Sequence, residues 1–310
     1  MAILITGGTG FLGRYLARSL VEKGEGPIVL FSRAPKRQAV ADIADKVELV
    51  SGDCAEYTEL LRVVKTYSIT DIFHMAGFVG QADKAPAETI RVNLVSTNNV
   101  FEAAMFAGVG RVVWASTAAV YPSVLTGPAP VVLDESTSVA PQTIYAAGKL
   151  WCECLAENYR QRYGFDHVAI RPTSVFGVGR SERLGEGRSM YTDMIEELLA
   201  GKRYVVPPRC HKLMWAYAGD CAEAFYCAWK AERLEHRVFL FGGEVCSVGE
   251  TVDYLRTLAP HIDVVFGADP TRIVPMVSTA LLEKETGYRP RYGMREGIRR
   301  YLDELQRAAP

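Results

Sequence analysis

The sequence has no long apolar run and no excess of charge of either sign. Its first apolar stretch, Ala2–Ile5, is followed by a glycine at position 7, so it is too short for the hydrophobic region of a secretory signal or for a membrane-spanning helix. The 35 basic and 36 acidic residues leave a formal net charge of −1, which does not suggest a surface for nucleic acid or for an anionic membrane. We therefore expect a cytoplasmic protein whose partners are small molecules.

Cysteine is not arranged for disulfides or for a metal. The chain has seven cysteines, an odd number, without CxxC spacing, and we expect all of them to be reduced. Cys152 and Cys154 are two positions apart, which places them on different faces of a helix. Because no group of histidines and cysteines has the spacing of metal ligands, we predict no metal site.

Strand-like apolar runs alternate with helix-length segments through the first half of the chain. This alternation is typical of βαβ units and of a parallel sheet, and 310 residues are enough to bury a substantial core. We predict an α/β fold with a Rossmann-like, doubly wound parallel sheet. The predicted strands are Ala2–Thr6, Pro27–Ser32, Val47–Ser51, Asp71–His74, Arg111–Ala115 and His167–Arg171, and the predicted helices are Leu12–Lys23, Tyr57–Tyr67, Glu88–Ala107 and Ile144–Tyr163.

After Pro172 the pattern becomes mixed. We predict a dinucleotide-binding domain over residues 1–172 and a smaller C-terminal, substrate-binding lobe over residues 173–310, with a segment that returns to the sheet. Four prolines interrupt the segment from Pro122 to Pro141, which predicts a loop. The elements expected in the second lobe are the strand Val238–Phe241 and the helices Tyr191–Leu199, Asp220–Ala231 and Arg295–Leu305.

A glycine turn joins the first strand to the first helix. The glycines at positions 7, 10 and 13 have GxxGxxG spacing, one residue wider in the first gap than the commonest dinucleotide motif. Glycine lets the backbone approach a pyrophosphate, whose charge the helix N-terminus favours. The alternative is that the glycines only turn the chain. The strand, turn and helix in this order favour a cofactor site made by Gly7, Gly10, Phe11, Leu12 and Gly13.

The end of the second strand carries no carboxylate for the adenosine ribose. Ser32 and Arg33 occupy that place, with Lys36 and Arg37 just beyond them. These residues suit a 2′-phosphate better than a free hydroxyl, so we predict NADP as the cofactor and keep NAD as the alternative. Lys36 and Arg37 can also be solvated loop charges.

Two further strand ends have polar residues. Asp53 and Cys54 follow the third strand, where a carboxylate can lie near the adenine amine. His74 ends the fourth strand after an apolar run, and we interpret it as a structural residue on the cofactor side rather than as a general base.

Tyr145 and Lys149 lie four residues apart and therefore on one face of a predicted helix. A tyrosine with a pKa near 10 is a poor base at neutral pH, but a neighbouring cation and an oxidised nicotinamide favour its phenolate form. Such a tyrosine can take the proton of a substrate hydroxyl while hydride leaves the carbon. We predict Tyr145 as the general acid and base and Lys149 as its partner and as a cofactor contact. Ser116 or Thr117, after the strand at 111–115, can polarise the substrate oxygen.

With these motifs the chain resembles the extended short-chain dehydrogenase/reductases, also called the NAD-dependent epimerase/dehydratase family. The resemblance implies that Thr117 is the catalytic hydroxyl beside Tyr145 and Lys149, that Asp53 contacts the adenine and that Ala76 belongs to the cofactor site. It also implies a homodimer built on the helices 88–107 and 144–163. The motifs that carry it are 6–13, 52–53, 74–77, Asn93, 116–121, 145–149 and 171–177.

Departures from the family pattern reduce the number of reactions that we expect of this chain. The dehydratases of this family follow the catalytic threonine with an Asp-Glu pair, where this chain has Ala118 and Ala119, so we do not expect dehydration. Met214 and Trp215 make the region that binds a sugar diphosphate look apolar. Cations that can still supply a phosphate contact are Lys212, Arg180, Arg183 and Arg188.

Three functions remain open from the sequence. The leading one is an NAD(P)-dependent oxidoreductase that interconverts a secondary alcohol and a carbonyl by hydride transfer. The second is a nucleotide-sugar epimerase that oxidises its substrate transiently with a bound NAD. The third is a cofactor-sensing binding protein that keeps the fold without the chemistry.

Overall fold

A seven-stranded parallel sheet forms the centre of the protein in a computed structural model that describes residues 2–79, 84–122, 132–180, 190–268 and 276–308. The strand order is β11-β7-β5-β4-β1-β2-β3. The order reverses between β1 and β4, and ligands of open α/β sheets bind at such a point, outside the carboxyl ends of the strands. The strands are β1 (Ala2–Thr6), β2 (Ile28–Ser32), β3 (Val47–Ser51), β4 (Ile69–His74), β5 (Arg111–Ala115), β7 (His167–Pro172) and β11 (Val238–Phe241).

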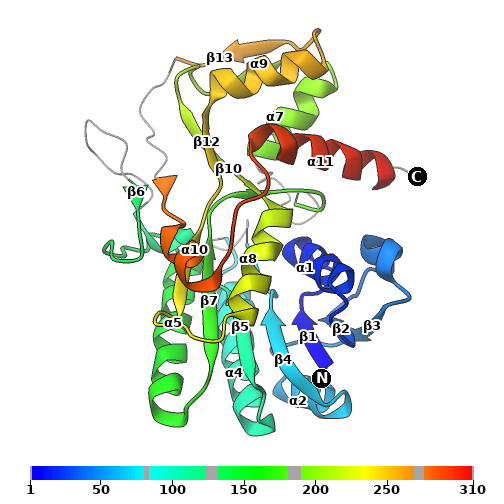
Figure 1. Ribbon diagram of the computed structural model, residues 1–310, viewed down its shortest axis with the longest axis vertical. Coiled ribbons are helices and arrows are strands. Elements are labelled where there is room, and N and C mark those ends of the chain that lie inside the picture. The colour runs from blue at the N-terminus through cyan, green and yellow to red at the C-terminus, as the bar shows by residue number, and fades with distance from the viewer. Residues whose placement is uncertain (1, 80–83, 123–131, 181–189, 269–275, 309–310) are drawn as a thin grey trace.

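Helices cover both faces of this sheet (Figure 1). On one face α1 (Phe11–Glu22) packs against α8 (Ala218–Lys230), and both contribute to a core with the inner residues of the strands. On the other face α2 (Tyr57–Thr66), α4 (Ser96–Ala107) and α5 (Ile144–Tyr163) enclose a second core. The predicted fold class, a Rossmann-like doubly wound α/β sheet, is confirmed.

Smaller elements lie above the carboxyl ends of the sheet strands. Figure 1 shows α7, α9 and α11 gathered there, and β10 and β12 lead toward them. A three-stranded sheet has the order β12-β10-β8, and β13 pairs with β9 and β14 with β6. The bounds are β6 (Val132–Leu133), β8 (Val175–Phe176), α7 (Met190–Leu199), β9 (Tyr204–Val206), β10 (Lys212–Tyr217), β12 (Glu244–Ser247), α9 (Val248–Leu258), β13 (Val264–Phe266), β14 (Met276–Val277), α10 (Ala280–Thr286) and α11 (Met294–Ala308).

The predicted element bounds differ from the observed ones at a few ends. The helix predicted over 88–107 begins earlier, as α3 (Pro86–Ile90), and passes through a π turn, η2 (Arg91–Val95), before α4. The segment predicted as a loop, Pro122–Pro141, contains the short strand β6, and its residues 123–131 lie outside the described part of the chain.

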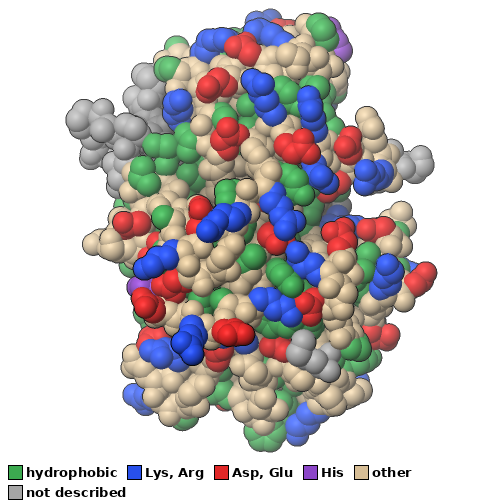
Figure 2. Space-filling model, viewed as in Figure 1, with side chains coloured by type: hydrophobic (Ala, Val, Ile, Leu, Met, Phe, Trp, Pro, Cys, Tyr) green, Lys and Arg blue, Asp and Glu red, His purple; other side chains and the backbone are tan. Residues whose placement is uncertain are grey.

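The surface mixes charges of both signs. Figure 2 shows acidic and basic side chains interspersed over the face in view, as the net charge of −1 suggests. Within the described ranges, none of the helices combines the length and apolar character needed to traverse a lipid bilayer.

Candidate active site

The glycine turn between β1 and α1 has no room for side chains. Gly7 has a φ of +64°, and a Cβ atom there would lie 2.8 Å from the backbone nitrogen of Ala76. A Cβ atom on Gly13 would lie 2.3 Å from the carbonyl oxygen of Gly7. No side chain caps the N-terminus of α1, where Phe11 and Leu12 follow Gly10. The turn therefore presents uncapped N–H groups at close backbone approach, and these residues fit a pyrophosphate.

Hydrogen bonds through His74 join the ends of β1 and β4. Thr6 Oγ1 lies 2.7 Å from His74 Nδ1, and His74 Nε2 lies 3.0 Å from Thr97 Oγ1. The backbone N–H of Ala76 donates to Thr6 Oγ1 over 3.4 Å. Burial lowers the pKa of His74 to about 3, so the ring is neutral. Thr6, which His74 orients, therefore holds Ala76 beside the glycine turn.

Charged side chains alternate beside the ends of β2 and β3. Arg33 pairs with Glu88 at 2.9 Å, and Arg91 Nη1 donates to Asp53 over 2.7 Å. Burial raises the pKa of Asp53, but hydrogen bonds from Ala55 and Arg91 outweigh it and lower that pKa overall. The Arg33 side chain keeps 56% of its surface exposed, so it is accessible to a ligand at this edge. Ser32 Oγ lies 3.5 Å from Thr9 Oγ1.

Cys54 lies beneath this edge rather than on it. Its thiol is buried in the core between β1 and α2, and burial raises its pKa to about 12. Its carbonyl oxygen accepts a hydrogen bond from Asn99 Nδ2 at 3.0 Å. The side chain of Cys54 therefore has a structural environment, whereas the neighbouring Asp53 is partly exposed.

Lys149 is fixed at the carboxyl end of β5. It is only 2% exposed, and its Nζ donates to the carbonyl oxygen of Ala115 over 2.7 Å. Burial lowers the pKa of its ammonium group. Lys149 thus brings one turn of α5 to the strand that ends just before Thr117.

The two hydroxyls after β5 have different partners. Ser116 Oγ is hydrogen-bonded to the buried carboxylate of Glu153, which also pairs with Arg171 Nη2 at 2.6 Å. Thr117 Oγ1 accepts from the backbone nitrogen of Ala119 at 3.1 Å and shares a hydrogen bond with Tyr145. Thr117 is therefore the hydroxyl that the structure brings to the tyrosine, as the family resemblance implies.

The network around Glu153 was not anticipated from the sequence. Arg171 Nη1 donates to Tyr121 OH over 2.6 Å, so the network reaches the segment after Thr117. Glu153 lies four residues after Lys149 on α5. A carboxylate at this spacing from a lysine lies on the same helix face and is visible in the sequence.

Tyr145 lies in the first turn of α5, which Thr143 caps by accepting from the backbone nitrogen of Ala146 at 3.1 Å. Burial raises the pKa of Tyr145, and the hydrogen bond with Thr117 and the charge of Arg180 oppose that rise. The phenol of Tyr145 thus lies beside the hydroxyl of Thr117, after the carboxyl end of β5. Of the other cations named from the sequence, Lys212 is exposed, and Arg183 and Arg188 lie outside the described residues.

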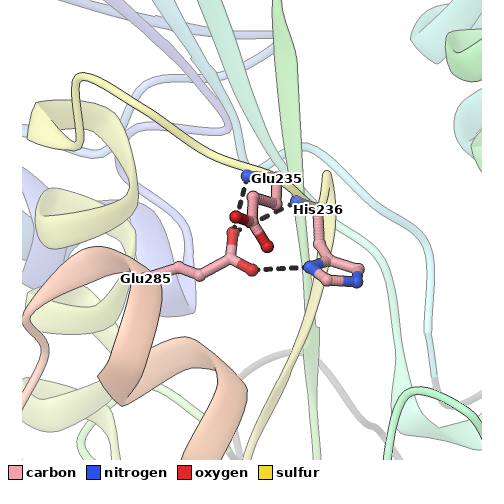
Figure 3. Close-up of side chains that lie close together, drawn as sticks. All are labelled: Glu235, His236 and Glu285. Atoms are coloured by element: carbon pink, nitrogen blue, oxygen red, sulfur yellow. Dashed lines mark hydrogen bonds and ion pairs between the residues drawn. The ribbon is translucent and has the colours of Figure 1, made fainter.

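One cluster with metal-ligand atoms lies away from this site, among the described residues. It consists of Glu235, His236 and Glu285, whose side chains point toward one another in Figure 3. Glu285 accepts hydrogen bonds from the backbone nitrogens of Glu235 and His236 and from His236 Nδ1, the last over 2.5 Å. Three N–H donors already satisfy the Glu285 carboxylate, so these three residues need no metal ion to hold them together.

A model of the NAD-dependent epimerase/dehydratase family matches residues 3–242. The chain belongs to this family. Its members are also called extended short-chain dehydrogenase/reductases, and the predicted resemblance is confirmed. The matched range contains the glycine turn, Thr117, Tyr145 and Lys149.

Curated relatives carry out both epimerisation and dehydrogenation. The chain is 27% identical over 278 residues to a UDP-glucose 4-epimerase of Halalkalibacterium halodurans, covering 84% of this chain and 81% of the relative. It is 31% identical over 235 residues to a D-erythronate dehydrogenase of Cupriavidus necator, covering 72% and 70%.

Solved structures of the family have the same fold over their full lengths. A UDP-glucose 4-epimerase of Thermus thermophilus in complex with NAD is 25% identical, with a TM-score of 0.82 and complete coverage of both chains. An L-threonine dehydrogenase of Clostridium difficile is 21% identical, with a TM-score of 0.83 and coverage of 99% and 98%. This member of the family is therefore an NAD(P)-dependent enzyme of the extended short-chain dehydrogenase type.

Proposed function

We propose that the protein interconverts a secondary alcohol and a carbonyl by hydride transfer. The observation that carries the proposal is that α5 brings Tyr145 to Thr117 and Lys149 to Ala115, both at the carboxyl end of β5. A nicotinamide dinucleotide, which the cradle at Gly7 and Gly13 fits, supplies the hydride acceptor when it is bound.

The three side chains divide the proton transfer between them. Thr117 orients the substrate hydroxyl by hydrogen bonding, and Tyr145 takes its proton as the carbon gives up hydride. Lys149, one turn after Tyr145 on α5, supplies a positive charge in a site of low dielectric, which favours the phenolate. In the reverse direction Tyr145 returns the proton to the carbonyl oxygen.

A nucleotide-sugar epimerase is the second candidate, and the UDP-glucose 4-epimerases among the relatives favour it. Both reactions use the same proton acceptor, but only a dehydrogenase produces reduced cofactor continuously. The test is to supply free NAD or NADP with a panel of secondary alcohols and, separately, with UDP-glucose. Net formation of reduced cofactor supports the first proposal, and sugar interconversion by a retained cofactor without net reduction supports the second. Cofactor binding without either activity would indicate a cofactor-sensing protein.

We propose NADP as the preferred form of the cofactor. Support comes from Ser32 and the half-exposed Arg33 at the end of β2. These residues take the place of the carboxylate that would bind a free ribose hydroxyl and repel a 2′-phosphate. The family relation and the NAD complex of a relative favour NAD instead. Dissociation constants of the two cofactors, measured side by side by calorimetry, decide between them.

We also propose a homodimer through α5 and the elements beside it. Ile144 and Trp151 are seven residues apart on α5 and are 38% and 46% exposed, and Ile90 at the end of α3 is 46% exposed. Large apolar side chains exposed on neighbouring helices favour an interface. The mass in solution at micromolar concentration tests this proposal.

A further inference from the structure

A chain of four alternating charges crosses the edge of the sheet where β2 and β3 end. Arg33 follows β2 and Asp53 follows β3, whereas Glu88 and Arg91 come from α3 and from the π turn η2, after β4. Arg33 Nη1 donates to Glu88 Oε1 over 2.9 Å, and Arg91 Nη1 donates to Asp53 Oδ2 over 2.7 Å. Between these pairs, Arg91 donates to both oxygens of Glu88, from Nε over 2.9 Å and from Nη2 over 3.1 Å. Glu88 therefore joins the two arginines.

The segments that carry Arg33 and Glu88 are anchored separately. The carbonyl oxygen of Arg33 accepts a hydrogen bond from Ser51 Oγ over 3.0 Å, which ties it to the end of β3. Beyond α3, the buried Asn93 exchanges two hydrogen bonds with the backbone of Phe78, over 2.9 and 3.0 Å. The carboxylate of Glu88 is therefore kept at this edge by its own segment, whether or not Arg33 binds it.

The pair of Arg33 and Glu88 lies where the 2′ position of a bound adenosine is expected. The residue at the end of the second strand of a dinucleotide fold is next to the adenosine ribose, and an arginine there accommodates a 2′-phosphate. Ser32 and Arg33 have that position, and Ser32 Oγ lies 3.5 Å from Thr9 Oγ1 in the glycine turn. The carboxylate of Glu88 thus borders the position of the phosphate.

Arg33, rather than Arg91, has donors left for a phosphate. All three side-chain nitrogens of Arg91 donate to Glu88 or Asp53. Among the described residues, the side chain of Arg33 is bound at Nη1 alone, by Glu88. A guanidinium group that binds a phosphate through two parallel hydrogen bonds needs two such nitrogens, so full engagement of Arg33 is favoured when Glu88 releases it.

A ligand can open this pair at low cost. The side chains of Arg33 and Glu88 are 56% and 33% exposed, and ion pairs at such exposure contribute little to stability. Glu88 keeps Arg91 when Arg33 leaves, so its charge is not left without a partner. A phosphate monoester carries about two negative charges at neutral pH, and it is repelled by the carboxylate that remains beside it.

We propose that Glu88 competes with the 2′-phosphate of NADP for Arg33 and thereby limits the preference for NADP over NAD. The inference rests on the proposed binding of NADP at Ser32 and Arg33, and it adds the residue that sets the strength of that preference. NAD has a free 2′-hydroxyl and leaves the pair of Arg33 and Glu88 closed. NADP opens the pair and then lies next to the carboxylate. Glu88 therefore weakens the binding of NADP and leaves that of NAD unchanged.

The test is a double-mutant cycle on cofactor affinity. The Kd values of NAD and NADP are measured by calorimetry for the wild type, Glu88→Gln, Arg33→Ala and the double variant. Glutamine keeps the length of the side chain and an acceptor for Arg91, and it removes the charge. We expect the ratio Kd(NAD)/Kd(NADP) to rise about fivefold in Glu88→Gln, with the Kd for NAD within about twofold of the wild type. In the Arg33→Ala background, Glu88→Gln should change this ratio by less than about twofold.

Glu157→Gln is the matched control. Glu157 binds the arginine three residues later, Arg160, through Nε over 2.8 Å and Nη2 over 2.7 Å, as Glu88 binds Arg91. It lies in the last two turns of α5, before the chain enters β7 at the opposite end of the sheet strands. This variant removes the same charge and should keep the wild-type ratio.

Two fragments of the cofactor locate the effect. Adenosine 2′,5′-diphosphate and adenosine 5′-monophosphate lack the nicotinamide half and differ only by the 2′-phosphate. Glu88→Gln should tighten the binding of the diphosphate and not that of the monophosphate. Equal tightening of both fragments would contradict competition for Arg33.

Other results would also overturn the inference. Weaker binding of NADP by Glu88→Gln would make Glu88 a support of Arg33 and not its competitor. An unchanged ratio, or the same gain in the Arg33→Ala background, would exclude competition at Arg33. The wild type alone tests the preference for NADP: tighter binding of NAD contradicts that preference, whereas a rise of the ratio in Glu88→Gln supports the competition in either case.

Discussion

Lys149 donates a hydrogen bond to the carbonyl oxygen of Ala115, and this contact of 2.7 Å ties α5 to the end of β5. Ala115 is the last residue of β5, two positions before Thr117, and Lys149 lies one turn after Tyr145 on α5. A strand end and a helix are thereby joined at the place where the hydroxyl, the phenol and the ammonium group must meet.

Tyr145→Phe removes the proton acceptor and keeps the ring. We expect kcat for alcohol oxidation to fall by about 10²–10⁴-fold, with an unchanged Kd for the cofactor, in steady-state kinetics and calorimetry. Tyr163→Phe is the control, since Tyr163 ends the same helix and is 65% exposed. Wild-type turnover by Tyr145→Phe would sink the assignment of this residue.

The two hydroxyls after β5 are expected to separate stability from catalysis. Ser116→Ala leaves the buried Glu153 without one of its donors and should lower the free energy of unfolding by about 1–3 kcal/mol, with kcat within about threefold of the wild type. Thr117→Ala should do the reverse, lowering kcat by about tenfold or more with a smaller loss of stability. Urea titrations and kinetics on both variants check this, and a swap of the two phenotypes would contradict it.

Much of the sheet could be predicted from the sequence because parallel strands buried on both faces are continuous apolar runs. The strands at 2–6 and 111–115 are of this kind and have the predicted bounds, and so does the less buried edge strand at 47–51. The strand Lys212–Tyr217 was not predicted, because it pairs with short strands, Val175–Phe176 and Glu244–Ser247, that are distant in the sequence. The helix α9 was not predicted either, although its capping box of Ser247 and Glu250 is visible in the sequence.

The site was predictable where chemistry requires particular residue types at fixed spacing, as for Tyr145 and Lys149. Partners that depend on the tertiary fold were not. Nothing in the local sequence indicates that Arg33 meets Glu88, or that Ser116 and not Thr117 is occupied by a buried carboxylate.

Arg33→Ala should change the choice of cofactor. Loss of the half-exposed guanidinium group removes the cation proposed to hold the 2′-phosphate. We expect the Kd for NADP to rise about tenfold or more and that for NAD to change by less than about twofold. Arg37→Ala is the matched control, because Arg37 pairs with the exposed Asp45 instead. Equal changes for NAD and NADP in Arg33→Ala would argue against the preference for NADP.

The free energy of unfolding should decrease at low pH because of His74. Its pKa is lowered to about 3 in the folded protein, against about 6.5 in the unfolded chain. Below pH 6.5 the unfolded state therefore binds more protons, so the free energy of unfolding decreases as the pH falls toward 3. The loss is on the order of 3 kcal/mol between pH 7 and pH 4.

Urea unfolding at several pH values measures this contribution. His74→Gln lowers stability at pH 7 but should flatten its dependence on pH. His261→Gln, at an exposed position, should leave the wild-type dependence in place. An unchanged pH profile in His74→Gln would show that His74 does not carry the effect.

Trp151→Glu should separate the proposed homodimer into monomers. Trp151 is 46% exposed in the middle of α5, in line with Ile144, and a carboxylate at the centre of an apolar interface is desolvated without a partner. Light scattering after size exclusion should give the mass of a dimer for the wild type and 34.2 kDa for the variant. Leu258→Glu, at the end of α9 and 39% exposed, is the control and should keep the wild-type mass. Because α5 also carries Tyr145 and Lys149, a monomer that retains full kcat shows that the helix keeps its place on β5 without a second copy of the chain. A wild-type protein that is already monomeric would refute the interface.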